Sequence, residues 1–294
     1  MDYKFQTIGL LGKRNDPRAG ETLVHLCAFL RRRQIRVIVD EYSSSHLQAE
    51  HGVEARDRAE IGRQCDLAIV VGGDGTLLDA ARSLVDSGVP LLGVNQGRLG
   101  FLVDVSPAEM TQRLEEILRG RYKEEERCLL NATIIRDGEV ASQSDALNDV
   151  VVHKHDVARI IEMQTYLDGH FITTYRADGL IVSSPTGSTA YNLSCGGPIL
   201  HPGLGCIVIV PICPHTLTNR PIVVDGSAEL EILVTGWHSD HTPVICDGQV
   251  VLSMEPGDRV VISVKERKLN LLQPAGHDYF EILRAKLNWG VHPK

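Results

Sequence analysis

Residues 66–85 read DLAIVVGGDGTLLDAARSLV, and this stretch decides how the first part of the chain folds. The run Asp66–Val71 is short, apolar and rich in β-branched side chains, as in strands buried within parallel sheets. Leu77–Val85 is composed of good helix formers. Between them, the three glycines within residues 72–75 let the backbone turn sharply. The stretch therefore predicts a strand, a tight turn and a helix.

The residues before this stretch alternate between strand and helix patterns. Thr7–Leu11 is a short apolar run, Glu21–Arg33 places apolar side chains at helical spacing, and Ile35–Val39 again favours a strand. The order strand, helix, strand, helix, strand indicates an α/β domain with a doubly wound, Rossmann-like sheet. We expect this domain to cover residues 1–126.

The pattern changes after Glu126. Short β-rich runs, broken by Gly, Pro, Asp and Asn, continue from Asn131 to Lys268 and predict a largely antiparallel, β-rich domain. We place this second domain at residues 127–274. Apolar side chains at helical spacing then predict a last helix at Tyr279–Lys286, within a C-terminal segment of residues 275–294.

Composition excludes several classes of protein. The 294 residues carry 30 Lys and Arg against 38 Asp and Glu, with 5% aromatic residues, which argues against nucleic acid as a partner. No apolar run is long enough to cross a membrane, and no secretory leader is recognisable, so we expect a cytoplasmic protein. The seven cysteines are scattered, which disfavours both a disulfide framework and a zinc knuckle.

The glycine-rich turn predicts a phosphate site. Glycines let backbone N–H groups approach a ligand, and the following helix presents its positive end. Asp74 would repel a phosphate, so we interpret it as a base, a hydroxyl acceptor or a metal contact. The alternative is a purely structural role as a helix cap. The P-loop lysine is absent, which disfavours a Walker-type nucleotidase. The turn resembles a signature shared by NAD kinases, lipid kinases and phosphofructokinases, which indicates phosphoryl transfer to an undefined hydroxyl.

Further motifs define that hydroxyl. Small and hydroxyl side chains fill residues 178–198 around a single aromatic residue, Tyr191, which could cover a base. Taken in order from residue 72 to residue 249, the motifs together resemble the bacterial ATP-dependent NAD kinases. They are Gly72-Gly73-Asp74-Gly75-Thr76, Asn95-Gln96-Gly97-Arg98-Leu99-Gly100-Phe101-Leu102, Asn148-Asp149, Asp178-Gly179 through Thr186-Gly187-Ser188-Thr189-Ala190-Tyr191-Asn192-Leu193-Ser194, and Asp247-Gly248-Gln249.

The resemblance implies a fold of the NAD kinase and diacylglycerol kinase type and phosphorylation of the 2′-hydroxyl of the adenosine ribose of NAD. Asp74 would be the general base or would position that hydroxyl. The residues implied to contact NAD are Asp74, Gly75, Asn148, Asp149, Arg159, Arg176, Asp178, Thr189, Ala190, Tyr191, Asn192, Leu193, Ser194 and Gln249. Many members of the family carry Asn-Glu where this chain has Asn148-Asp149, so the shorter carboxylate is expected to act through water.

Phosphate contacts are expected from the two turns of small residues, namely Gly72, Gly73, Gly75, Thr76, Thr186, Gly187 and Ser188. A divalent cation such as Mg²⁺ should arrive with ATP, because the sequence has no dense carboxylate cluster and predicts no protein metal site. The resemblance also implies a homodimer or homotetramer, and a last helix that packs back on the first domain.

Alternative interpretations remain open. A lipid or sugar kinase would share the first motif, and a non-catalytic NAD(H) sensor would share the pocket. His153 and His155 alternate on an expected strand, but without a third ligand we favour a polar strand face over a metal site. Cys213 and His215 are disfavoured as a nucleophile and base. The use of polyphosphate, the acceptance of NADH and the feedback inhibitor are left undecided.

Overall fold

The computed structural model describes residues 3–44, 47, 53–97, 100–103, 105–154, 160–235 and 242–290. The chain forms two compact units, Met1–Glu126 with Leu269–Lys294, and Arg127–Lys268. The return to the first unit begins six residues before the expected Ala275, because Leu269–Pro274 is strand β19 of the first sheet, where Leu271 pairs in parallel with Leu91.

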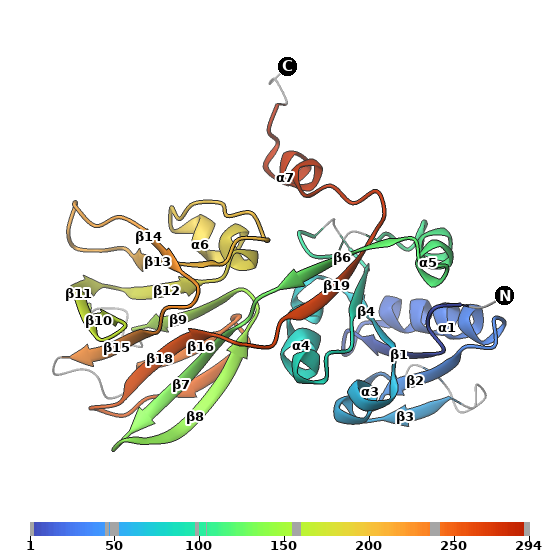
Figure 1. Ribbon diagram of the computed structural model, residues 1–294, viewed down its shortest axis with the longest axis horizontal. Coiled ribbons are helices and arrows are strands. Elements are labelled where there is room, and N and C mark those ends of the chain that lie inside the picture. The colour runs from blue at the N-terminus through green and yellow to red at the C-terminus, as the bar shows by residue number, and fades with distance from the viewer. Residues whose placement is uncertain are drawn as a thin grey trace. The chain divides into compact units, whose positions relative to one another are not determined.

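The first unit is built on a seven-stranded sheet with the order β3-β2-β1-β4-β5-β19-β6 (Figure 1). The first five strands of the chain run parallel, and the order reverses between β1 and β4, as in doubly wound folds. The other strands are β1 (Thr7–Gly12), β2 (Arg36–Asp40), β3 (Glu54–Arg56), β4 (Leu67–Gly72), β5 (Leu91–Asn95) and β6 (Tyr122–Arg127).

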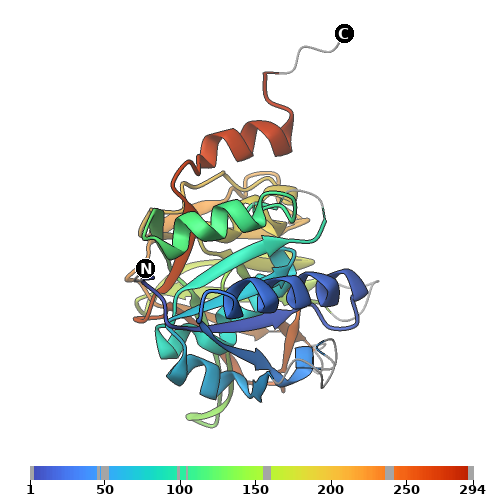
Figure 2. The ribbon, with the colours of Figure 1, turned by 90° about the vertical axis from the view of Figure 1, so that its right-hand side faces the viewer.

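Helices cover both faces of this sheet. The helical elements of the unit are α1 (Pro17–Arg31), α2 (Glu41–Ser44), α3 (Arg58–Gln64), α4 (Asp74–Leu84), η2 (Val85–Ser87), α5 (Met110–Leu118) and α7 (Tyr279–Leu287). Helices α1 and α5 contribute to one apolar cluster with alternate residues of β1, β2, β4 and β5, and Figure 2 shows them side by side. Helix α3 lies on the opposite face, where a Cβ atom at Gly9 would come within 2.6 Å of Ile61.

Local sequence explains where these elements begin. All six residues of β4 are buried, which accounts for its continuous apolar run. Helix α1 begins at Pro17, four residues before the expected Glu21, because Asp16 caps it by accepting the Arg18 N–H and proline suits the first turn. Helix α4 begins at Asp74 itself, so the predicted acid lies in the first turn of the helix.

The second unit consists of two six-stranded antiparallel sheets. Their orders are β11-β10-β15-β18-β7-β8 and β14-β13-β12-β9-β16-β17. The first contains β7 (Leu130–Arg136), β8 (Glu139–Ala146), β10 (Ile161–Leu167), β11 (His170–Ala177), β15 (Leu230–Thr235) and β18 (Arg259–Val264). The second contains β9 (Asp149–His153), β12 (Gly179–Ser183), β13 (Cys206–Ile212), β14 (Ile222–Asp225), β16 (Pro243–Cys246) and β17 (Val250–Ser253).

Apolar side chains from both sheets form one buried cluster, as expected of a β-sandwich. On the second sheet, a smaller cluster joins Ile181, Val208 and Val210 to Leu200. Leu200 follows two short helical turns, η3 (Thr186–Thr189) and α6 (Tyr191–Ser194), which therefore sit close to that sheet. Among the described residues, no helix combines the length and apolar character that a membrane crossing requires.

Candidate functional site

The glycine-rich turn in the first unit joins β4 to α4 and is tightly packed at Gly72, whereas a Cβ atom at Gly73 would meet no atom within 4 Å. A Cβ atom at Gly72 would lie 2.3 Å from the Thr76 hydroxyl oxygen, so only glycine fits there. Gly73 is the N-cap of α4 and has no side chain to bond the first turn. An uncapped helix N-terminus of this kind favours an anion. The turn thus places glycine backbone at the positive end of α4.

Backbone amides hold the carboxylate of Asp74. Its Oδ2 accepts the Phe101 N–H at 2.9 Å, and its Oδ1 accepts those of Leu102 and Val103, both at 3.2 Å. A carboxylate oxygen has two lone pairs. Counting the described residues, Oδ1 is saturated, whereas Oδ2 has one lone pair for a further donor. Asp74 is half-buried, so this lone pair could accept a hydroxyl group of a ligand.

The segment that holds Asp74 is itself fixed. Asn95 donates through Nδ2 to the Val103 carbonyl at 3.2 Å and accepts the Gly97 N–H at 2.8 Å. A Cβ atom at Gly100 would come within 2.0 Å of Asp74 Oδ1, so the residue must be glycine. Sequence reasoning used this segment to establish the resemblance and missed that it holds the acid. The residue that could have indicated this contact was Gly100, but the sequence does not show that Asp74 is the residue packed against it.

In the second unit, Asn148 and Asp149 are mounted on a turn that a second carboxylate binds. Asp247 accepts the Leu147 N–H at Oδ2 (3.0 Å) and those of Asn148 (2.7 Å) and Asp149 (3.3 Å) at Oδ1. The Asp247 N–H donates to the Asp149 carbonyl at 2.9 Å. Burial, together with the negative charge of Asp247, raises the pKa of the Asp149 carboxyl to about 7.

The turn at residues 184–188 packs directly on Asn148. The Ser184 N–H donates to the Asn148 carbonyl at 2.9 Å, and the Ser184 hydroxyl donates to the Leu147 carbonyl at 2.5 Å. A Cβ atom at Gly187 would come within 2.1 Å of the same Asn148 oxygen. The structure therefore brings the residues expected at NAD, Asn148 and Asp149, beside residues expected at phosphate, Thr186 and Gly187.

Ser188 and Asn192 are placed inside this segment. The Ser188 side chain bonds to the Pro185 carbonyl at 2.7 Å and accepts the Leu200 N–H at 3.0 Å. Asn192 donates through Nδ2 to the carbonyls of Ser188 and Pro198 at 2.8 and 3.0 Å. Both side chains are fully buried. Both side chains thus satisfy backbone groups of their own segment, as a run of small polar residues must, and the ligand contacts expected of them stay a prediction.

The exposed surface of the same segment comes from its other residues. Tyr191 is 40% exposed, and Ser194 is exposed as well, whereas Thr189, Ala190 and Leu193 are half-buried. Burial and a hydrogen bond to Cys195 raise the pKa of the Tyr191 hydroxyl. The tyrosine is thus partly exposed, and its contact with a base stays a prediction.

Two of the remaining predicted residues are engaged in ion pairs. Arg176 lies 3.0 Å from Glu162, and Asp178 lies 2.5 Å from the Lys154 ammonium group. Gln249 is exposed in the turn after β16. Arg159 lies outside the described residues, as does His155, so the expected strand face of two histidines is described only at His153.

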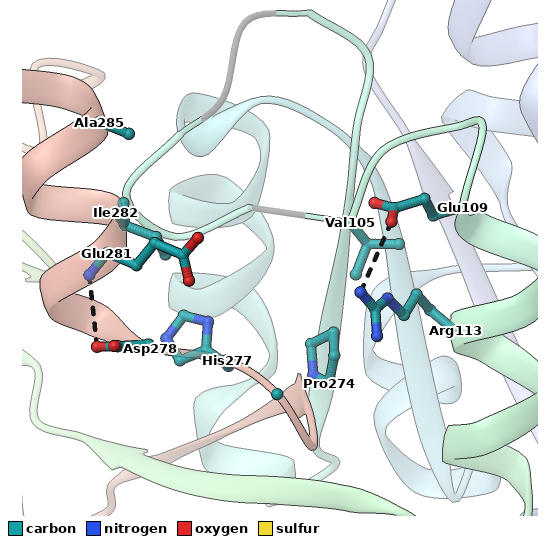
Figure 3. A pocket seen from close by; sticks show the side chains of 10 residues that line it. Val105, Glu109, Arg113, Pro274, His277, Asp278, Glu281, Ile282 and Ala285 are labelled. Carbon is teal, nitrogen blue, oxygen red and sulfur yellow. Dashed lines mark hydrogen bonds and ion pairs between the residues drawn. The ribbon is translucent and has the colours of Figure 1, made fainter.

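A separate cavity of about 240 Å³ lies in the first unit (Figure 3). It is formed by the start of α5, the end of β19 and α7, and no residue predicted from the sequence lines it. Figure 3 shows Arg113 directed toward Glu109, its ion-pair partner at 3.6 Å. Among the described residues, no three His, Cys, Asp or Glu side chains come together in a way that could hold a metal ion.

Comparison with known families matches almost the whole chain. The profile of the ATP-NAD kinase N-terminal domain matches residues 8–122, and that of the ATP-NAD kinase C-terminal domain matches residues 147–273. The NAD kinase of Chromohalobacter salexigens is 48% identical over 285 residues, which are 97% of each chain. The NAD kinase of Nitrosococcus oceani is 46% identical over 290 residues, 99% of each chain.

Solved structures show the same fold. A yeast NADH kinase complexed with NADH has a TM-score of 0.90 and 24% identity, over 98% of this chain and 89% of that one. An NAD kinase from Archaeoglobus fulgidus in complex with ATP has a TM-score of 0.74 and 24% identity, over 96% of this chain and 98% of that one.

Proposed function

Because the chain belongs to the ATP-NAD kinase family, we propose that Asp74 and the turn that carries it transfer a phosphoryl group from ATP to NAD. The enzyme is an NAD kinase that forms NADP and ADP. The 2′-oxygen of the adenosine ribose forms a bond to the γ-phosphorus of ATP, and the bond from that phosphorus to the β,γ-bridging oxygen breaks. The hydroxyl proton is accepted by Asp74 Oδ2 or passes from it to water.

The fixed carboxylate of Asp74 is the observation that carries this proposal. Phosphoryl transfer passes through a loose transition state, so an enzyme contributes mainly by positioning the reactants and neutralising charge. Three hydrogen bonds from backbone N–H groups orient the Asp74 carboxylate and leave a lone pair of Oδ2 for the attacking hydroxyl. The adjacent turn, Gly72–Thr76, supports the triphosphate through the N-terminus of α4.

A divalent cation such as Mg²⁺ is proposed to arrive bound to ATP. When bound, it would neutralise charge on the phosphate oxygens. The glycine turn fits such a substrate, because the N-terminus of α4 has no side-chain cap and Gly72 and Gly73 carry no side chain that would keep a phosphate from the backbone. Asp74 is the one acid of that turn, and its oxygens are largely occupied by amides.

For the dinucleotide, we propose that Asn148 and Asp149 bind the adenosine part and that the Tyr191 ring covers a base. Asp149 is 5% exposed, so a hydroxyl that reaches it would be well shielded from water. Arg176 and Asp178 would contact the ligand from within the ion pairs they form with Glu162 and Lys154. Thr189, Ala190, Leu193, Ser194 and Gln249 are proposed to complete the surface.

The test is to incubate the purified protein with ATP, Mg²⁺ and NAD and to quantify NADP and ADP. We expect equal amounts of both products. Absence of NADP, together with phosphorylation of sphingosine or diacylglycerol, would instead show a lipid kinase. Calorimetric binding of NAD without ATP-dependent product would show a sensor. A cytoplasmic location, a dimeric or tetrameric assembly and the divalent cation stay predictions.

A further inference from the structure

We propose that Asp247 is a positioning residue for NAD, which fixes the backbone on which Asn148 and Asp149 are mounted. This inference rests on the proposed function and adds a residue for which the motif analysis gave no role. Asp247 is 9% exposed and binds three consecutive N–H groups, those of residues 147–149. The backbone N–H of Asp247 in turn donates a hydrogen bond to the Asp149 carbonyl. A side chain so engaged acts on the ligand through the turn that it holds.

The bonding pattern requires a carboxylate. The Leu147 N–H points to Oδ2, whereas the Asn148 and Asp149 N–H groups point to Oδ1. Asparagine has one acceptor oxygen, so its NH₂ group would face one of these N–H donors. The same turn supports the Ser184 amide and the close approach of Gly187. A displaced turn would therefore shift the groups proposed to bind adenosine and the neighbouring phosphate turn together.

Asp247 also acts electrostatically on Asp149. Its charge and the burial of Asp149 raise the pKa of that carboxyl to about 7. Among the described residues, the other titratable groups that interact with Asp149 are Tyr191 and Cys195, from the segment of α6. The pKa values of both are raised above their ordinary values, so both are neutral at pH 7. Within the described part of the chain, Asp247 is thus the charged neighbour that adds to the effect of burial on the pKa of Asp149.

The experiment compares Asp247→Asn with the wild type in steady-state kinetics from about pH 5.5 to about pH 9. We expect KM for NAD to rise at least about tenfold while kcat changes less than about threefold, since the turn binds ligand and does not react. The acid limb of the pH profile of 1/KM should move about one unit lower, because the charge that opposes ionisation of Asp149 is gone. If Asp247 positions the turn but its charge does not affect the ionisation of Asp149, the acid limb of the 1/KM profile should not move.

Two variants serve as controls. Asp66→Asn alters an aspartate in the other unit that accepts two consecutive N–H groups, those of Gln6 and Thr7, through a single oxygen. Its KM and pH profile should equal those of the wild type. Asp247→Glu keeps the charge but displaces the oxygens, so KM should rise without a shift of the limb. This variant also decides the question where Asp247→Asn does not fold.

The outcomes separate this inference from the proposed function. A wild-type enzyme that makes no NADP contradicts the proposed function. A wild-type enzyme that makes NADP, beside a folded Asp247→Asn variant with unchanged KM and unchanged acid limb, overturns the role of Asp247 alone. In an Asp149→Asn background, Asp247→Asn should raise KM and leave the pH profile unchanged. A shifted limb there would assign the titration to another group.

Discussion

Asp74 in the first unit and Asp247 in the second bind the backbone in the same way, yet their surroundings differ. Each carboxylate accepts N–H groups from three consecutive residues, 101–103 and 147–149 respectively. Asp74 is half-buried, so the lone pair it keeps on Oδ2 can meet a ligand. Asp247 is nine-tenths buried and directs its bonds at a turn that carries other functional groups. Under the proposed roles, exposure, and not the hydrogen-bond pattern, distinguishes the reacting carboxylate from the supporting one.

The largest expected effect is the loss of kcat when the charge of Asp74, the more exposed of the two carboxylates, is removed. Asp74→Asn should lower kcat by roughly 10² to 10⁴, the usual contribution of a general base. Affinity for NAD should stay within about tenfold, a difference of about 1.4 kcal/mol. NADP formation and calorimetry measure the two quantities. Turnover equal to that of the wild type would remove Asp74 from the mechanism and break the comparison.

Asp149, the neighbour of the buried Asp247, is expected to make the stability of the protein depend on pH. The pKa of Asp149 rises from an ordinary value of 3.8 to about 7, so the folded protein binds this proton more tightly than the unfolded chain does. Its contribution to stability is complete below pH 3.8 and is lost as the pH rises to about 7. Asp149→Asn should therefore raise the free energy of unfolding at pH 8 by up to about 4 kcal/mol.

Urea denaturation of Asp149→Asn and the wild type at pH 5 and at pH 8 provides the measurement. The gain should be larger at the higher pH, because ionisation of Asp149 destabilises only the wild type. An equal effect at both pH values would show that burial of the carboxyl group does not govern this titration.

Gly100→Ala tests how closely the first carboxylate must be held. The new Cβ atom would lie 2.0 Å from Asp74 Oδ1, so the carboxylate or the loop must move. We expect kcat to fall about tenfold to a hundredfold, since a displacement of about 1 Å can have this effect. Gly276→Ala is the matched control, because a Cβ atom there meets no atom within 4 Å. Equal kcat values in the two variants would contradict the importance of this contact.

The smallest effect is expected at Asp66, which accepts two N–H groups through Oδ2 alone. Asp66→Asn can present its single carbonyl oxygen to both donors, so the free energy of unfolding should change by less than about 1 kcal/mol. Thermal unfolding tests this value. A large loss would mean that charge, rather than the number of acceptor oxygens, makes an aspartate of this type stabilising.

The sequence predicted the elements of the fold better than their ends. The buried strand β4 and the helix α4 follow from hydrophobicity and from the glycines between them, which are local properties. The assignment of Leu269–Pro274 to the first sheet did not follow from the sequence. This strand has the composition of the preceding β-rich domain, and only its pairing with β5 shows which sheet it joins.

For the site, the sequence by itself determined which residues are chemically suited to a phosphate turn and a hydroxyl acceptor, because glycine spacing and an adjacent acid are features of neighbouring residues. It also carried the family resemblance. Only the tertiary structure decided that the amides of residues 101–103 hold Asp74, that Asp247 holds residues 147–149, and that Ser188 and Asn192 point inward. The physical reason is that hydrogen bonds between distant segments and the burial of side chains depend on how the strands pair, and this pairing joins residues as far apart in the chain as Leu91 and Leu271.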